Sequence, residues 1–238
     1  GGARAWRSTG VRDSVGSWTL IASPQITDSP RALWAADINR DGDTDVMFNR
    51  AGGGLNLYRG DGGNAWTYCA AFNAIGGAYT GTYESVIAAP FDRNIQYPQI
   101  VGGRADGGGL RLFGNYTADC SYFFEIPITT TGSYRALSAA DIDDDSYWQL
   151  VAAPYHLLNQ GLRVFENGAN GWQLHSIPVA TGTYCDTALA DFNNDGKHDI
   201  AAAECTPGNG GGLNVFEYWS RGWISHNLTG PGMFYAVA

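Results

Sequence analysis

Residues 191–199 read Asp-Phe-Asn-Asn-Asp-Gly-Lys-His-Asp, and residues 37–45 repeat the pattern as Asp-Ile-Asn-Arg-Asp-Gly-Asp-Thr-Asp. Both stretches fit D-x-N-x-D-G-x-x-D. Each follows a run of small residues and precedes a short apolar stretch, such as the one from Asp199 to Ala203. A turn rich in Asp, Asn and Gly between two short apolar runs is typical of a β-hairpin.

This hairpin belongs to a repeating unit. The run before the turn ends at alanines spaced by 53, 51 and 50 residues, namely Ala36, Ala89, Ala140 and Ala190. A later segment alternates apolar and polar residues, as a strand does, and begins at Gly2, Gly54, Gly109, Gly161 and Gly212. A last segment follows a further turn and opens with an aromatic residue at Trp18, Trp66, Tyr122, Trp172 and Trp223. Each unit therefore supplies four strands.

Four antiparallel strands in about 50 residues are typical of a propeller blade. The sequence predicts an all-β fold, a β-propeller with five blades of four antiparallel strands, forming one domain over residues 1–238. The blades are expected at residues 29–79, 80–131, 132–181, 182–231, and 232–238 together with 1–28. The last blade would be shared by both termini and incomplete. Three explanations remain open: a truncated sequence, which we favour, a parent with more blades, or a strand donated by another molecule.

Composition narrows the class of protein. Hydrophobic residues make up 44% of the 238 residues and charged residues only 16%, which excludes a disordered chain. The net charge of -9, with no basic stripe, argues against nucleic acid as a partner. No apolar run is long enough to span a membrane. Four cysteines, the acidic balance and the Asn-x-Thr sites for N-glycosylation at Asn115 and Asn227 favour a secreted or cell-surface protein.

The two acidic loops have the composition of a calcium site. Oxygen ligands at positions 1, 3, 5 and 9, a backbone carbonyl at position 7 and a glycine at position 6 suit a hard cation, and calcium better than magnesium. The expected ligands are Asp37, Asn39, Asp41, Asp43, Asp45, Asp191, Asn193, Asp195, Lys197 and Asp199. The alternative is a metal-free turn, but clustered carboxylates repel unless a cation neutralises them.

The other two copies of the loop are altered. The third keeps Asp141, Asp143 and Asp145 but lacks the glycine and the final aspartate, so we expect weaker binding there. The second begins with Pro90 in place of the first ligand, and we expect no ion in it.

The acidic loop, the small-residue strand after it and Gly-Gly-Leu-Asn-Val-Phe together resemble the FG-GAP/VCBS repeats of integrin α-subunit propellers, bacterial surface proteins and fungal propeller lectins. The resemblance spans essentially the whole chain, with two loops matching well, one partly and one poorly. It implies that calcium is chiefly structural and sits in the hairpins on one face, while partners bind the other face.

The cysteines suggest two bridges. Cys185 and Cys205 lie on the two strands of one hairpin. Residues that pair across a hairpin have numbers with a constant sum, and the two cysteines have the same sum as the loop ends Asp191 and Asp199. We therefore expect the cysteines to face each other and form a disulfide. Cys69 and Cys120 lie near the start of fourth strands in neighbouring units. They are expected either to join two blades or to remain free buried thiols.

No catalytic constellation is evident. The four histidines sit in different units without a repeated acid partner or metal-ligand spacing, and Ser or Cys nucleophile motifs are missing. Propeller enzymes exist, so fold alone does not exclude catalysis. The sequence nevertheless favours a protein that binds rather than catalyses.

The face opposite the metal hairpins is the expected binding surface. Its repeated Gly-Thr/Ser-Tyr segments and neighbouring polar groups give the candidate ligand residues Tyr83, Arg104, Tyr134, Tyr155, His156 and Tyr184. Tyrosines with hydroxyls nearby suit a sugar ring. The alternative is that each tyrosine fills the corner between blades.

Together these features predict a non-enzymatic extracellular calcium-binding propeller that binds carbohydrate, as a lectin does. The alternative is a structural or adhesive module. Its partners would be extracellular proteins, or further copies of itself in a homo-oligomer or fibre formed by strand donation.

Overall fold

The computed structural model describes residues 6–8, 18–20, 30–50, 53–63, 65–69, 81–115, 117–119, 121–154, 160–205, 212–219, 222–230, 234 and 237. Every regular element within these ranges is a β-strand, and all strand pairs are antiparallel. None of the described residues belongs to a helix that is long and apolar enough to cross a membrane.

Four sheets have four strands each, in chain order. The first contains β3 (Leu33–Ala36), β4 (Asp45–Asn49), β5 (Leu55–Gly60) and β6 (Trp66–Tyr68). The second contains β7 (Tyr83–Ala89), β8 (Gln99–Arg104), β9 (Leu110–Asn115) and β10 (Phe123–Pro127). The third contains β11 (Tyr134–Ala140), β12 (Gln149–Pro154), β13 (Arg163–Gly168) and β14 (Gly171–Ser176). The fourth contains β15 (Tyr184–Ala190), β16 (Asp199–Glu204), β17 (Gly212–Trp219) and β18 (Gly222–Asn227).

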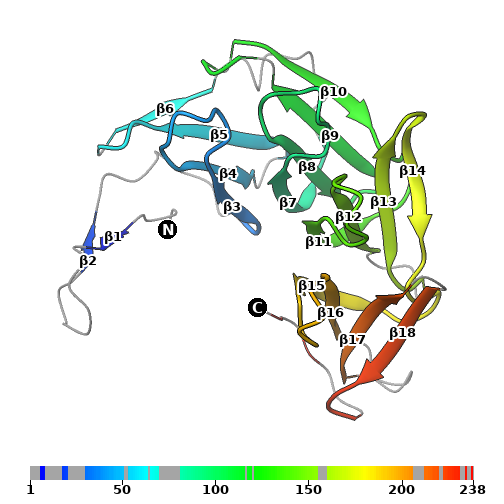
Figure 1. Ribbon diagram of the computed structural model, residues 1–238. Helices are drawn as coiled ribbons and strands as arrows, with labels where there is room; N and C mark the ends of the chain where they lie inside the picture. The colour runs from blue at the N-terminus through cyan, green and yellow to red at the C-terminus, as the bar shows by residue number, and fades with distance from the viewer. Residues whose placement is uncertain are drawn as a thin grey trace.

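The sheets follow one another along an arc (Figure 1), with the first strand of each sheet on the inner side and the fourth strand outside. Neighbouring first strands contact each other: β3 contacts β7, β7 contacts β11, and β11 contacts β15. The prediction of four-stranded units is therefore confirmed for four units. The sheets formed by the described residues do not close into a ring.

The expected fifth blade is seen only in pieces. Its predicted third and fourth strands, β1 (Trp6–Ser8) and β2 (Trp18–Leu20), form a two-stranded sheet. Of residues 232–238, only Phe234 and Val237 are described. The Phe234 N–H donates to the carbonyl of Glu204 at 3.0 Å, and the Val237 N–H donates to Asp186 Oδ2 at 3.0 Å. The described C-terminal residues thus lie against the fourth sheet.

Small residues on the second strands let the sheets approach closely. The β12 and β16 strands are buried along their whole length and carry runs of alanine, and β8 carries Gly102 and Gly103. A Cβ on Gly103 would come within 3.0 Å of the Tyr134 carbonyl oxygen in the third sheet, and a Cβ on Gly102 within 3.3 Å of Leu55 in the first sheet. Because packed interiors tolerate little change in volume, larger residues here would push the sheets apart.

A β-bulge recurs near the start of three first strands. The register shifts between Tyr83 and Ser85, between Tyr134 and Ala136, and between Tyr184 and Asp186. Glu84, Arg135 and Cys185 are therefore extra residues at equivalent positions. A bulge at a fixed place in each unit strengthens the local twist and marks the units as structural repeats.

Candidate metal loops and binding groove

The first and fourth acidic loops have the same internal hydrogen bonds. In the first, the Asp37 carboxylate accepts the N–H groups of Asp41 at 3.1 Å and Gly42 at 3.0 Å. In the fourth, Asp191 accepts those of Asp195 at 3.0 Å and Gly196 at 2.9 Å. Both glycines have a φ of 91°, in the left-handed region that a side chain disfavours. The turn therefore favours glycine at position 6, as the sequence pattern predicts.

The last carboxylate of each loop is buried beneath the turn. Asp45 is 1% exposed and accepts the N–H groups of Ile38 at 2.8 Å and Gly60 at 3.0 Å. Asp199 is also 1% exposed and accepts the Phe192 N–H at 3.0 Å. Burial raises the pKa of Asp45 to about 6 and also raises the pKa of Asp199. A negative charge at either position is therefore costly unless a cation lies nearby.

These donor sets fit a hard cation. Above the buried carboxylate, the first loop has side-chain oxygens of three aspartates and one asparagine, and the fourth loop has those of two aspartates and one asparagine. Neither buried carboxylate has a positive partner among its described contacts. Six to eight oxygens are what calcium takes. Among the described residues, the two close groups of three metal-ligating side chains both lie in the third unit. The carboxylates of the first and fourth loops would therefore have to move closer together to coordinate an ion.

The pH dependence of stability without calcium should report on Asp45. Because its folded pKa of about 6 lies above the ordinary 3.8, the folded state holds this proton more tightly, and stability falls as pH rises from about 4 to 6. The full effect is roughly 3 kcal/mol. Urea unfolding in a chelator should show that, as pH rises through this range, the free energy of unfolding falls less for Asp45→Asn than for wild type. Asp43→Asn, in the same loop but less buried, should follow wild type; parallel curves for all three would contradict the assignment.

Two of the loops replace the buried carboxylate with an amide. Gln99 and Gln149 are fully buried, and their Oε1 atoms accept the N–H groups of Asp92 at 2.8 Å and Ile142 at 2.6 Å. These are the bonds that Asp45 and Asp199 make in the other loops. The second and third loops therefore keep the turn without burying a charge.

The third loop nevertheless brings acidic groups together. Asp141, Asp143 and Asp145 place carboxylate oxygens within 4.8 Å of one another. The Oδ2 atom of Asp141 accepts the Ser146 N–H at 2.9 Å, whereas its Oδ1 atom is buried with no hydrogen-bond partner in the described part of the chain. Ser146 stands where the first and fourth loops have glycine and keeps a left-handed φ of 69°. This loop has the closest cluster of acids, although the sequence predicts weaker binding there.

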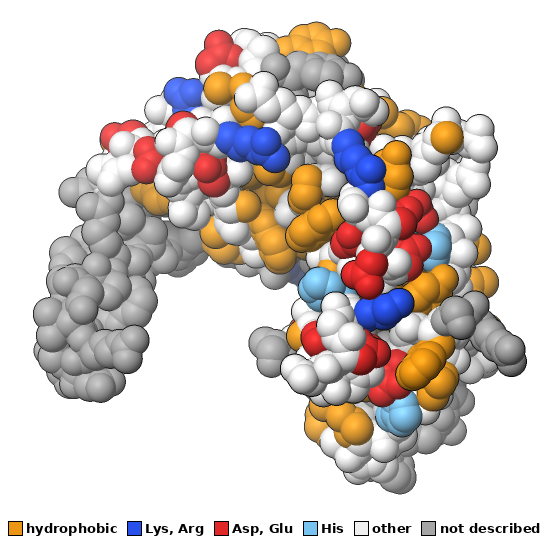
Figure 2. Space-filling model, in the orientation of Figure 1, with side chains coloured by type: hydrophobic (Ala, Val, Ile, Leu, Met, Phe, Trp, Pro, Cys, Tyr) orange, Lys and Arg blue, Asp and Glu red, His pale blue; other side chains and the backbone are white. Residues whose placement is uncertain are grey.

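Contacts between loops join neighbouring sheets. Arg93 of the second loop donates to the carbonyls of Asp145 at 2.5 Å and Ser146 at 2.9 Å, and its guanidinium lies 3.8 Å from the centre of the Tyr147 ring. From the fourth loop, His198 Nδ1 lies 3.1 Å from the carbonyl oxygen of Asp141. Figure 2 shows acidic and basic side chains interspersed along this face. These contacts link the second and fourth loops to the third loop, and so connect the three sheets.

Three of the predicted ligand residues lie in the core. Tyr83, Tyr134 and Tyr184 are 0%, 7% and 4% exposed. Their rings pack edge-on against phenylalanines of their own sheets, with centroids 6.3, 6.4 and 6.1 Å apart. The hydroxyl of Tyr83 is buried without a partner among the described residues, and burial raises its pKa. Each tyrosine also belongs to a core cluster that includes residues of the preceding sheet. These three tyrosines therefore pack between sheets, as the alternative proposed, and do not form an open face.

Of the other predicted ligand residues, Arg104 forms an ion pair with Asp106. Its Nε and Nη2 atoms donate to the two carboxylate oxygens of Asp106, both at 2.7 Å. This bidentate bond lowers the pKa of Asp106 to about 2. Tyr155 and His156 lie outside the described residues.

The disulfide between Cys185 and Cys205 is confirmed, with the two Cα atoms 5.7 Å apart. Cys69 is buried and also disulfide-bonded; its expected partner, Cys120, lies outside the described residues. The glycosylation prediction at Asn227 falls on an exposed side chain whose Nδ2 donates to Asn214 Oδ1 at 3.0 Å. Asn115 is the last residue of β9, and its side chain is not among those described.

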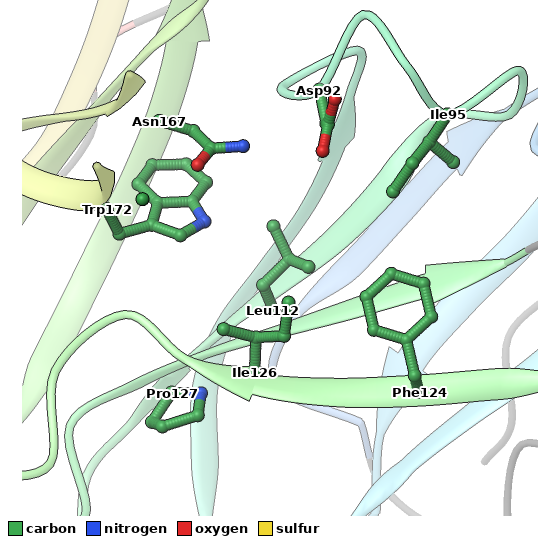
Figure 3. A pocket seen from close by; sticks show the side chains of 9 residues that line it. Asp92, Ile95, Leu112, Phe124, Ile126, Pro127, Asn167 and Trp172 are labelled. Carbon is green, nitrogen blue, oxygen red and sulfur yellow. The ribbon is translucent and has the colours of Figure 1, made fainter. Parts of the chain in front are cut away.

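A groove between the second and third sheets was not anticipated from the sequence. Its volume is about 180 Å³. Figure 3 shows the indole of Trp172 and the amide of Asn167 on one side, the carboxylate of Asp92 on another, and Phe124 opposite the indole. The remaining lining residues are Ile95, Leu112, Ile126, Pro127 and Gly171. Trp172 also packs edge-on against Phe91, with centroids 5.3 Å apart. The groove thus combines an anchored aromatic ring with two polar groups.

The sequence could have indicated this groove only weakly. Trp172 belongs to the aromatic residues that open every fourth strand, and these are most simply explained as packing between units. What distinguishes Trp172 is its neighbours, which come from another unit and are unrelated in sequence position. The chain matches no protein-family model and no curated protein.

Proposed function

We propose that the protein is a five-bladed β-propeller of the FG-GAP/VCBS type that binds carbohydrate outside the cell, without catalysis. Four consecutive four-stranded sheets whose first strands contact one another support the propeller. The shared hydrogen bonds of the first and fourth loops, above buried carboxylates, support calcium as their resident ion. The Cys185–Cys205 disulfide supports an oxidising compartment.

The groove beside Trp172 carries the functional part of the proposal. A sugar ring offers C–H patches that stack on an aromatic face and hydroxyls that hydrogen-bond to polar side chains. Trp172 provides the face, and the Asp92 carboxylate and Asn167 amide provide the polar groups. At about 180 Å³ the groove is smaller than the roughly 300–1,000 Å³ typical of sites for drug-sized ligands. It therefore suits a single terminal sugar residue.

Removal of the indole should abolish most of this binding. A glycan array with calcium present would identify the preferred saccharide, and titration with that saccharide would then compare variants. Trp172→Ala should weaken binding by about 10-fold or more, since an aromatic contact contributes about 0.5–1.5 kcal/mol beyond the area it buries. Trp219→Ala, at an exposed tryptophan on β17 that does not line the groove, should bind as wild type does.

Other results would favour the rival function. If no saccharide binds and the protein instead assembles as its concentration rises, an adhesive or structural module is the better explanation. Saccharide binding that Trp172→Ala leaves intact would keep the lectin activity but place its site elsewhere.

A further inference from the structure

A histidine and two carboxylates converge on the third sheet, next to the third acidic loop. His175 lies on β14, Glu166 on β13 and Asp143 in the turn between β11 and β12. One ligand atom from each lies within 4.8 Å of the others. Their side chains are 21%, 18% and 19% exposed, so the cluster is recessed but open to an ion from solution.

A β-bulge places the histidine. Phe165 pairs with Leu174 and Val164 pairs with Ser176, which leaves His175 as the extra residue. Bulges re-aim side chains and are over-represented beside functional sites. On the same hairpin, Trp172 packs against the second sheet, while the His175 ring lies 6.0 Å from the Tyr218 ring of the fourth sheet. The histidine is thus separate from the proposed sugar groove, on the opposite side of the third sheet.

The two ring nitrogens of His175 have different surroundings. The Nδ1 atom lies 2.6 Å from Glu166 Oε2, which is a hydrogen bond, and the Nε2 atom lies 3.7 Å from Asp143 Oδ2, which is too long for one. Two ligand atoms each about 2.1 Å from a tetrahedral ion are separated by roughly 3.4 Å. The spacing of Nε2 and Oδ2 therefore suits two atoms that share a metal ion. A carboxylate on the other nitrogen is the usual means of orienting a metal-binding histidine.

The neighbouring acidic groups can complete the coordination. Asp143 also belongs to the group formed with Asp141 and Asp145. The buried Oδ1 atom of Asp141, without a partner among the described residues, is an available ligand. Asp143 is held in place because its Oδ1 atom accepts a hydrogen bond from Gln149 Nε2 at 2.9 Å, which leaves Oδ2 facing the histidine.

The fourth sheet contains a natural comparison. Glu217 and His226 occupy the positions of Glu166 and His175, again nine residues apart, and His226 Nε2 lies 3.3 Å from Glu217 Oε1. There the register runs without a bulge, and the loop has Asn193 where the third loop has Asp143. This pair is in neither close group of metal-ligating side chains among the described residues. The carboxylate and the bulge are what distinguish the third sheet.

We propose that the third unit binds a divalent transition-metal ion of the zinc class through His175 Nε2 and Asp143 Oδ2, with Asp141 or Asp145 as further ligands and Glu166 orienting the imidazole. Calcium takes oxygen ligands, whereas imidazole nitrogen suits zinc, copper and nickel. The site is distinct from the calcium loops in its ligand type, and its occupancy does not depend on sugar binding.

Calorimetric titration with Zn²⁺ should be carried out in excess calcium, which fills sites made of oxygen ligands alone. Wild type should bind one equivalent. His175→Gln should lower the affinity by about 100-fold or more, and Glu166→Gln by roughly 10–100-fold, as for other residues that orient a ligand. Asp143→Asn, which copies the asparagine of the fourth loop, should have an effect comparable to that of His175→Gln. The matched control His226→Gln should bind zinc as wild type does.

Paramagnetic resonance of the Cu²⁺-loaded wild-type protein provides a readout that needs no variant. One nitrogen should couple to the copper, and the coupling should change when histidine is labelled with ¹⁵N. The proposal is overturned if wild type binds no zinc in excess calcium, if the bound copper shows no nitrogen coupling, or if His226→Gln removes as much zinc affinity as His175→Gln. None of these results would alter the outcome of the saccharide titrations.

Discussion

Removal of calcium is expected to lower the melting temperature by roughly 10–20 °C. An ion at 100 times its dissociation constant stabilises the folded state by about 2.7 kcal/mol, and the first and fourth loops would each hold one. For a domain of this size, 1 kcal/mol corresponds to about 2–4 °C. The physical reason is that Asp45 and Asp199 are buried with raised pKa values, so the ion offsets an electrostatic cost that the metal-free fold must bear.

Calorimetric melts with calcium and with a chelator would measure this shift. The paired variant Asp37→Asn with Asp191→Asn should show a much smaller difference between the two conditions, because the first ligand of each loop loses its negative charge. Asp61→Asn, in an exposed turn outside the loops, should retain the full difference. An unchanged melting temperature of wild type in chelator would remove calcium from the proposal.

Loss of the Cys185–Cys205 disulfide is expected to cost about 3 kcal/mol of unfolding free energy, given the 20-residue separation that it closes. The bridge ties β15 to the end of β16, and the fourth acidic loop is the turn of this hairpin. The paired substitution Cys185→Ser with Cys205→Ser should therefore also weaken calcium binding in that loop. Denaturant unfolding with and without calcium would measure both effects.

The first loop provides the control for this experiment. Its hairpin has no cysteine, so its calcium affinity should not change when the bridge is removed. Unfolding curves of the variant and wild type that coincide under oxidising conditions would mean that the bridge does not constrain the unfolded chain as expected.

The strands were predictable because each unit carries alternation, turn residues and a fixed spacing. The disulfide was also predictable, but its numerical argument was only partly right. Asp199 pairs with Ala190 rather than Asp191, and beyond the bulge Tyr184 pairs with Glu204, so Cys205 is not directly opposite Cys185 in the ladder. A bulge depends on twist and on contacts between sheets, neither of which periodicity reveals. The disulfide nevertheless forms, with Cys185 as the extra residue of the bulge and the two Cα atoms 5.7 Å apart.

The binding residues were less predictable. Sequence cannot distinguish a tyrosine that faces a neighbouring sheet from one that faces solvent, so Tyr83 and its equivalents were assigned to a surface although they are buried. The histidines were judged to lack a repeated acid partner, and this was wrong. Glu166 with His175 and Glu217 with His226 share one spacing. Aligning the units residue by residue would have revealed the repeat.

The recurring bulge also offers a place to reinforce the protein by design. In the second sheet, Glu84 occupies the position of Cys185, and the Ala105 N–H donates to the Thr82 carbonyl just as the Cys205 N–H donates to that of Thr183. The combined change Glu84→Cys and Ala105→Cys should therefore accept a transplanted cross-link without rebuilding the backbone. Because the units share this backbone geometry, a disulfide found in one repeat can be introduced at the equivalent position of another.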